Sequence, residues 1–248
     1  MEVHILTIFP DMFASPLQGS ILQRAQERGF LQVHVHNLRS FTTDRHHVTD
    51  DAPYGGGAGM IMKLEPLVRG IQEIQAHFGP AHVILLSPQG MVLTQECAKT
   101  LAGHERLLLL CGRYGGVDAR IQAYIHAELS IGDYVLTGGE LPALVLLDVI
   151  GRLLPGVLGD PHSVEEDSLY YGLLQGPQYT RPAEFNGMRV PDTLLSGDHA
   201  AILQWRRRQA LWTTLQRRPD LLQTAQLAPE DQAILQECQH AGVPPHGS

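Results

Sequence analysis

The sequence predicts an α/β fold: a mostly parallel β-sheet with helices on both faces, followed by a small helical C-terminal domain. Over the first two-thirds of the chain, short apolar runs typical of buried parallel strands alternate with helical patterns. After a polar, acidic stretch near residue 160, only helical patterns follow. We therefore expect a sheet domain over residues 1–158, a flexible linker over 159–172 and a helical domain over 173–248.

The sheet domain is predicted to begin with a strand at residues 3–9. A helical pattern at 16–28 ends at Gly29, and residues 31–35 form the second strand. The polar, glycine-rich stretch at 39–59 is too long for an ordinary connection. Beyond it we expect helices at 65–78, 94–102 and 118–125, buried strands at 82–86 and 106–111, and a strongly apolar helix at 141–154 that Pro155-Gly156 ends.

The C-terminal domain is predicted around a helix at 198–218, with Ser196 or Asp198 as its N-cap and Pro219 as its stop. Pro229 begins a last helix, which Gly242 ends. We expect disorder only in the Pro/Gly-rich end at 242–248, because the rest of the chain is neither highly charged nor repetitive.

Composition narrows the classes of protein. The 248 residues are 44% hydrophobic, which is enough for a sizeable core. No apolar run approaches ~20 residues and no signal-peptide pattern is present, so neither a membrane span nor secretion is expected. The three cysteines have no close pair, which predicts a reducing cytoplasm without disulfides or a thiolate zinc site: Cys97, Cys111 and Cys238.

The charge pattern is compatible with one specific polyanionic partner but not with general binding of nucleic acids. A net charge of −8 argues against a general nucleic-acid binder. Between residues 199 and 218, however, there are five arginines and no acid: Arg206, Arg207, Arg208, Arg217 and Arg218. A solvated helix face is the simpler interpretation of this stripe.

Three buried strands, those at 82–86 and 106–111 and one that precedes Ile131, run into turns rich in glycine or polar residues, at 87–90, 111–116 and 131–140. In a parallel sheet, ligands bind outside the carboxyl ends of the strands, and glycine lets the backbone approach a ligand closely. Each turn alone is explained by tight βα geometry, but the three together favour a pocket for an adenosine. Apolar walls are expected from Leu86, Ile131, Tyr134 and Leu136.

Other binding motifs fit less well. The glycine-rich segment at 54–60 lacks the Gly-Lys-Ser/Thr of a phosphate loop, so a kinase or hydrolase using Gly55 to Gly59 with Lys63 is a weak rival. No Gly-x-Gly-x-x-Gly follows the first strand, which argues against a nicotinamide dehydrogenase. The histidines at 34, 36, 46 and 47 have no carboxylate or cysteine at ligand spacing, so no metal site is expected.

The turns also carry a family resemblance. Ser87-Pro88-Gln89-Gly90, Gly112-Arg113-Tyr114, Ser130-Ile131-Gly132-Asp133-Tyr134-Val135-Leu136 and Gly138-Gly139-Glu140-Leu141-Pro142 closely resemble the bacterial tRNA (guanine-N(1)-)-methyltransferase family, of the SPOUT class of knotted methyltransferases. Flanking segments match in order from Met1 to about Leu222, among them Pro53-Tyr54-Gly55-Gly56-Gly57 and Tyr179-Thr180-Arg181-Pro182.

The resemblance implies properties that periodicity does not reveal. It implies a deep trefoil knot in the sheet domain, which ordinary topology rules would not predict. It also implies binding of S-adenosylmethionine by the sheet domain, binding of tRNA by the helical domain, and a homodimer with shared active sites. The cofactor site that it implies is lined by Leu86, Ser87, Pro88, Gly112, Tyr114, Ile131, Gly132, Tyr134, Val135, Leu136, Gly138, Gly139 and Pro142.

The implied reaction methylates N1 of the guanosine immediately 3′ of the anticodon, position 37 of tRNA, where another guanosine precedes it. That nitrogen carries a proton, so the reaction needs a general base near it and a cation near the neighbouring oxygen. Asp167 matches the family's catalytic aspartate, and Glu165 and Glu166 beside it would raise its proton affinity. Arg152 matches the catalytic arginine. We also expect tRNA to order the linker that carries Asp167.

Candidate tRNA contacts lie in two regions. In the long polar loop they are Arg45 and His46, and in the C-terminal domain they are Ser196, Arg206, Arg207 and Arg208, with Arg217 and Arg218 as further phosphate contacts. Trp205 and Trp212 could stack on bases, but core packing is the favoured role. A non-catalytic RNA-binding module is the second rival, disfavoured because Asp167 and Arg152 are both present.

One position departs from the family pattern. Relatives carry a glutamate after Gly-Arg-Tyr, linked to dependence on a divalent ion, whereas this chain has Gly115. Whether a Mg²⁺ role carries over is therefore left open, and Asp118 and Glu140 are the remaining nearby carboxylates.

Overall fold

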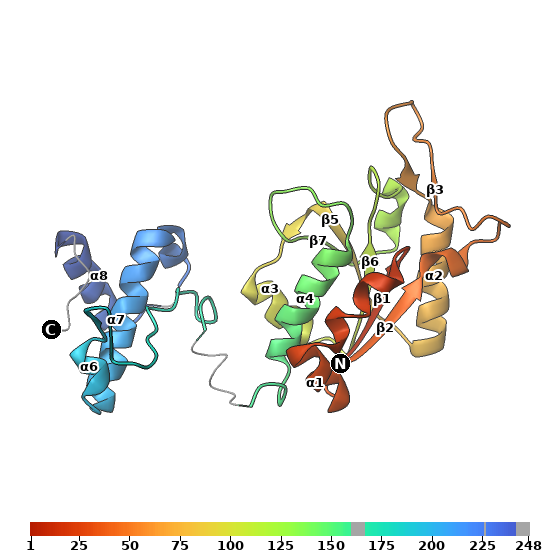
Figure 1. Ribbon diagram of the computed structural model, residues 1–248. Helices are drawn as coiled ribbons and strands as arrows, with labels where there is room; N and C mark the ends of the chain where they lie inside the picture. Colours follow the sequence, from red (N-terminus) through yellow and green to blue (C-terminus); the bar gives the residue numbers. More distant parts are fainter. Residues whose placement is uncertain (160–166, 226, 242–248) are drawn as a thin grey trace. The chain divides into compact units, whose positions relative to one another are not determined.

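The computed structural model describes residues 1–159, 167–225 and 227–241, and it consists of two compact units (Figure 1). The N-terminal unit is Met1–Gly159 and the C-terminal unit is Asp160–Ser248. Half of the linker that we expected, residues 160–166, lies outside the described residues, as does the C-terminal end from Gly242. The predictions of disorder and of ordering by tRNA therefore stay predictions.

The N-terminal unit is built on a five-stranded sheet in the order β2-β1-β6-β5-β7. Every pair of neighbours in it is parallel, which confirms the predicted sheet. The strands are β1 (Glu2–Thr7), β2 (Gln32–Asn37), β5 (His82–Val92), β6 (Arg106–Cys111) and β7 (Ala127–Ser130). The four consecutive leucines of β6, residues 107–110, are fully buried because the sheet is covered on both faces.

Two hydrophobic cores lie on opposite faces of this sheet, as alternation of side chains along a strand requires. Ile5 and Leu109 face a core shared with α1 (Ser20–Glu27), α3 (Gln95–Ala102) and α4 (Glu140–Leu153). Leu6 and Leu108 face the other core, which contains α2 (Leu64–Phe78) and the 3₁₀ helices η3 (Leu38–Phe41) and η4 (Ala119–Ala123). Figure 1 shows α2 on the opposite side of the sheet from α1 and α4. The trefoil knot stays a prediction.

Several local predictions are wrong in their bounds. The helix predicted at 16–28 is split, because Pro16–Gln18 forms the 3₁₀ helix η2, Gly19 is extended and α1 begins at Ser20. Another 3₁₀ helix, η1 (Pro10–Phe13), precedes it. β5 does not end at Leu86 as predicted. It continues to Val92 through a bulge, with Leu86 and Met91 both opposite Leu129 of β7.

The long polar stretch contains a small antiparallel hairpin. β3 (Asp50–Asp51) pairs with β4 (Ile61–Met62), and the segment from Gly55 to Gly59 is the connection between them. A phosphate loop joins a strand to a helix, so this placement removes the support for the kinase or hydrolase alternative.

The C-terminal unit is mainly helical, as predicted. Its elements are a hairpin of β8 (Glu184–Phe185) and β9 (Met188–Arg189), which the sequence analysis missed, α6 (Asp192–Leu195), α7 (His199–Arg217), η5 (Pro219–Gln223) and α8 (Pro229–Ala241). Asp198 is the N-cap of α7, because its carboxylate accepts the N–H groups of Ala200 and Ala201; Ser196 instead ends α6. Leu173, Leu211 and Leu235 form its core. None of the described helices is long and apolar enough to cross a membrane.

Candidate functional site

Two of the three candidate loops meet directly at the carboxyl edge of the sheet. The loop after β6 and the loop after β7 are joined by a hydrogen bond from Gly139 N to Gly112 O of 2.9 Å and by an antiparallel bridge between Arg113 and Gly138. The third segment, the bulge of β5, lies against β7. The parallel sheet thus brings together segments that are separated by about two dozen residues each in the sequence.

Close backbone contact explains why glycine occupies two of these positions. A Cβ atom on Gly139 would lie 2.7 Å from Cys111 Cα and 3.0 Å from Gly112 N. A Cβ atom on Gly90 would lie 2.4 Å from the backbone of Glu128 and Leu129. At both positions the space is too small for a Cβ atom, so the loops can pack in this arrangement only with glycine at residues 90 and 139.

The loop after β7 presents exposed apolar side chains around this backbone. Its turn is held by a hydrogen bond from Ser130 Oγ to Gly132 O of 3.0 Å and by one from Tyr134 Oη to Ile131 O of 3.1 Å. Tyr134 is 55% exposed, Val135 85% and Leu136 37%. Backbone polar groups next to uncovered apolar side chains are what a flat heterocycle with polar edges requires.

A buried carboxylate lies beneath the same loops. Glu140, the first residue of α4, is fully buried and accepts a hydrogen bond from Thr7 Oγ1 at 2.7 Å and one from Arg113 Nε at 3.0 Å. The sequence analysis missed Thr7 and Arg113 as members of this group. The sequence signal for this group is a glutamate at the start of an apolar helix, but that signal does not show which residues the glutamate binds.

Both carboxylates that were considered as substitutes for the family's glutamate are already bound to arginines. Glu140 pairs with Arg113, and Asp118 pairs with Arg120 at 2.6 Å. Hydrogen bonds from the Arg120 side chain and backbone lower the pKa of Asp118 to about 2. Gly115 itself is confined, since a Cβ atom there would lie 3.1 Å from Met60 O. Within the described ranges, no group of three or more His, Cys, Asp or Glu side chains could hold a metal ion.

The two predicted catalytic residues belong to different units. Arg152 lies in the last turn of α4 in the N-terminal unit and is half-buried. Asp167 belongs to the C-terminal unit, where it lines a pocket of about 220 Å³ together with Tyr171, Trp205 and Arg206. Glu165 and Glu166, which we expected to raise its proton affinity, lie outside the described residues.

The arginine stripe of α7 is largely paired with acids that follow it in the sequence. Arg207 donates to Asp231 at 2.9 and 2.6 Å, Arg208 to Glu237 at 2.6 Å, and Arg218 to Asp220 at 2.7 Å. Arg217 is exposed. The stripe therefore combines structural ion pairs with exposed guanidinium surface, and its positive potential is weaker than the arginine count suggests.

The remaining candidate contacts have local structural roles as well. Ser196 Oγ donates to Thr193 O at 2.8 Å and accepts from Asp198 N at 3.1 Å. Arg45 and His46 are near the turn that Asp44 holds by accepting the N–H groups of His46 and Val48. Trp205 is only 7% exposed and its ring contacts Tyr179, which agrees with the favoured packing role.

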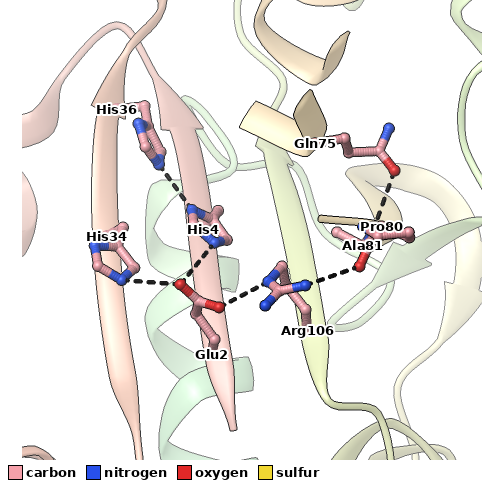
Figure 2. Close-up of polar contacts among 8 residues, drawn as sticks. All are labelled: Glu2, His4, His34, His36, Gln75, Pro80, Ala81 and Arg106. Atoms are coloured by element: carbon pink, nitrogen blue, oxygen red, sulfur yellow. Dashed lines mark hydrogen bonds and ion pairs between the residues drawn. The ribbon is translucent and has the colours of Figure 1, made fainter. Parts of the chain in front are cut away.

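A second polar cluster extends along β1, β2 and β6, from Glu2 and Arg106 at the starts of their strands to His36 near the end of β2 (Figure 2). His4, which is fully buried, shares a hydrogen bond of 2.9 Å with His36. The Nε2 atoms of His4 and His34 lie 3.3 and 3.2 Å from Glu2 Oε1, close enough for ion pairs but without hydrogen-bond alignment. Arg106 donates to Glu2 Oε2 at 2.7 Å.

The fold and the edge loops define an α/β protein with glycine-rich loops at the carboxyl edge of a parallel sheet, the edge at which such sheets bind ligands, and with a further helical unit. A family model described as tRNA (Guanine-1)-methyltransferase TrmD matches residues 1–224. The chain belongs to this family.

Individual relatives agree with that assignment. The chain is 52% identical over 240 residues to a tRNA (guanine-N(1)-)-methyltransferase of Pelotomaculum thermopropionicum, covering 96% of each chain. It is 51% identical over 245 residues to the protein of the same name in Geobacter sulfurreducens, covering 98% of this chain and 100% of that one. A crystal structure of the tRNA (m1G37) methyltransferase from Aquifex aeolicus matches with a TM-score of 0.74 and 36% identity, over 90% of this chain and 95% of that one.

Proposed function

We propose that this protein transfers a methyl group from S-adenosylmethionine to N1 of the guanosine immediately 3′ of the anticodon, position 37 of tRNA, in the bacterial cytoplasm. The observation that carries the proposal is the junction of the Gly112 and Gly139 loops at the sheet edge, in a chain that belongs to the tRNA (Guanine-1)-methyltransferase family. The glycine-rich segment connects the two strands of a hairpin, so it does not offer a competing phosphate site. Among the described residues there is also no cluster of side chains that could hold a metal ion.

The residues at the sheet edge fit S-adenosylmethionine. Glycines at positions where any Cβ would collide let the loop backbones pack closely, and we assign the backbone N–H and C=O groups of these loops that are not paired with each other to the edge of an adenine. Tyr134 and Leu136 supply exposed apolar surface for the faces of the ring. We assign the rest of the site to the other residues expected from the family resemblance, including Leu86, Ser87, Pro88, Tyr114, Val135 and Pro142. When bound, the cofactor supplies a methyl group that its sulfonium charge has already activated.

The protein must remove one proton and stabilise one developing charge. We assign the proton to the Asp167 carboxylate, because N1 of guanine has no available lone pair until its proton leaves. We assign the guanine oxygen to the Arg152 guanidinium, which stabilises negative charge as N1 is deprotonated. The pocket that Asp167 lines also contains Tyr171 and Arg206, an exposed aromatic ring beside a cation that suits an unstacked nucleotide.

We further propose that the protein is a homodimer in which the two subunits share each active site. Leu141 and Val145, one turn apart on α4, are 48% and 41% exposed, which leaves two apolar side chains on the outer face of the helix, next to the exposed Asp148. Light scattering should give twice the chain mass of 27.3 kDa. A monomer at the concentration that supports full activity would contradict this part of the proposal.

A methyl-transfer assay tests the function. Unmodified tRNA with guanosine at position 37, incubated with S-adenosylmethionine, should gain one methyl group, mapped to N1 of that base by nuclease digestion and mass spectrometry. The same tRNA with adenosine at that position is the control and should gain none. Methylation elsewhere in the tRNA, or none at all, would overturn the proposal.

A further inference from the structure

We propose that Glu140 is a positioning residue for the methyl-donor site, and that it acts by fixing Arg113 and Thr7 in one buried group. This inference rests on the proposed function, because the loops that Glu140 holds are those assigned to S-adenosylmethionine. Glu140 and Arg113 belong to the motifs that carry the family resemblance, and the inference gives them a joint structural role that includes a contact from the carboxyl end of β1 to the start of α4.

Each oxygen of the Glu140 carboxylate binds a different part of the chain. Oε1 accepts from Thr7 Oγ1 at 2.7 Å, at the end of β1 and 133 residues away in the sequence. Oε2 accepts from Arg113 Nε at 3.0 Å and lies 3.0 Å from its Nη2, in the loop after β6. Since Glu140 itself follows the loop after β7, one side chain links three segments at the sheet edge.

Burial makes this link strong. The side chains of Glu140 and Arg113 are 1% and 15% exposed, and Thr7 is fully buried. A buried carboxylate needs its partners, because each unmade hydrogen bond leaves a desolvated charge. The three groups are thus committed to one geometry, which a solvent-exposed ion pair would not enforce.

Arg113 and Glu140 also contact the backbone of the loop after β7. Gly138 is bridged to Arg113, and a Cβ atom on Gly138 would lie within 2.7 Å of both the Arg113 side chain and Glu140. The neighbouring Gly139 N–H donates to Gly112 O. The Arg113 side chain and the Glu140 carboxylate therefore pack against the Gly138 backbone where the two glycine loops meet.

The same contacts fix the outer half of Arg113. Its guanidinium carbon lies 4.3 Å from the centre of the Phe9 ring, and its Nη2 lies 3.4 Å from the sulfur of Met12. Phe9 N also donates to Thr7 Oγ1 at 2.9 Å, so the Thr7 hydroxyl connects the Phe9 backbone to Glu140. The Glu140 group therefore fixes the positions of the Arg113 guanidinium and the Phe9 ring beside the loops.

The test separates positioning from folding. Glu140→Gln keeps the shape but removes the charge, so the dissociation constant and KM for S-adenosylmethionine should rise about tenfold or more, with kcat at saturating cofactor within about threefold. Exchange of the Gly139 amide should accelerate. Glu96→Gln, in the first turn of α3 with its side chain 84% exposed, is the matched control and should match wild type.

A second pair keeps the proposal testable if Glu140→Gln does not fold. Thr7→Val removes only the hydroxyl and should weaken cofactor binding about threefold or more, whereas Thr7→Ser should restore it. If both Glu140→Gln and Thr7→Val melt earlier but bind the cofactor as wild type does, Glu140 is merely structural and the proposal is wrong. If wild-type protein itself has no saturable affinity for S-adenosylmethionine, the proposed function fails first and this role fails with it.

Discussion

Replacing the buried His4 should make the N-terminal unit less sensitive to acid. Burial, followed by the neighbouring His36, lowers the pKa of His4 from its ordinary 6.5 to about 4. The groups facing it are Glu2 on its own strand, His34 and His36 on β2, and Arg106 on β6, while the ring of Phe78 from α2 lies 4.5 Å away (Figure 2). His4→Gln removes the titrating ring and keeps a side chain that can donate and accept.

The sign and size follow from linkage. Because the folded state disfavours the charged imidazole, the unfolded state binds the proton more readily below pH 6.5. Stability is therefore fully present above that pH and is lost as the pH falls toward 4. Between pH 7 and pH 5 the loss from this one group is about 2 kcal/mol. His36, whose pKa burial also lowers, shares a hydrogen bond with His4, so the two titrate as a pair.

The assay must report on the N-terminal unit. Both tryptophans of the chain, Trp205 and Trp212, belong to the C-terminal unit, so their fluorescence would follow the wrong part of the molecule. Native-state hydrogen exchange of β1 amides, corrected for intrinsic rates, gives the free energy of opening at each pH. His77→Gln, which removes an exposed imidazole next to the same Phe78 ring, is the control. Parallel losses in wild type and His4→Gln from pH 7 to pH 5 would refute the reasoning.

Other predictions address the site and the helical unit. Asp167→Asn should lower turnover by about 100-fold or more while leaving the dissociation constant for S-adenosylmethionine within about twofold, and full activity would remove Asp167 from the base role. Gly139→Ala should destabilise the N-terminal unit by about 1–3 kcal/mol and abolish measurable cofactor binding, because its Cβ would lie 2.7 Å from Cys111 Cα. Gly19→Ala, with its nearest contact at 3.7 Å, is the control, and equal effects of the two would contradict the steric argument. Asp198→Ala should destabilise α7 by about 1 kcal/mol, seen as faster exchange of the Ala200 and Ala201 amides; unchanged exchange would show that the cap is dispensable.

The local sequence pattern predicts those strands and helices whose own residues already indicate how deeply they are buried. The four leucines at 107–110 have no polar alternation, and they are buried from both faces. The Gly112 and Gly139 loops were expected at one edge because the carboxyl ends of parallel strands meet there. Their contact is confirmed by the hydrogen bond from Gly139 N to Gly112 O, whereas the binding of a ligand there stays a prediction.

The parts that escaped prediction depend on partners distant in the sequence. Ser87 to Gly90 reads as a turn, yet β5 continues beyond it because Met91 and Val92 pair with β7. In the sequence, Glu140 is only an acidic residue at the start of a predicted helix. Its partner Thr7 is 133 residues away and comes close to it only in the folded chain. The arginines of α7 looked unpaired because Asp231 and Glu237 lie on a different helix, 24 and 29 residues further on.

Titration of isotope-labelled full-length protein with S-adenosylmethionine, followed by amide chemical shifts, locates the cofactor site directly. We expect saturable shifts concentrated at Gly112, Gly132, Gly138 and Gly139, with the amides of Gly55 to Gly59 unaffected. Saturable shifts confined to that hairpin connection or to the C-terminal unit, or no shifts at all, would contradict this prediction.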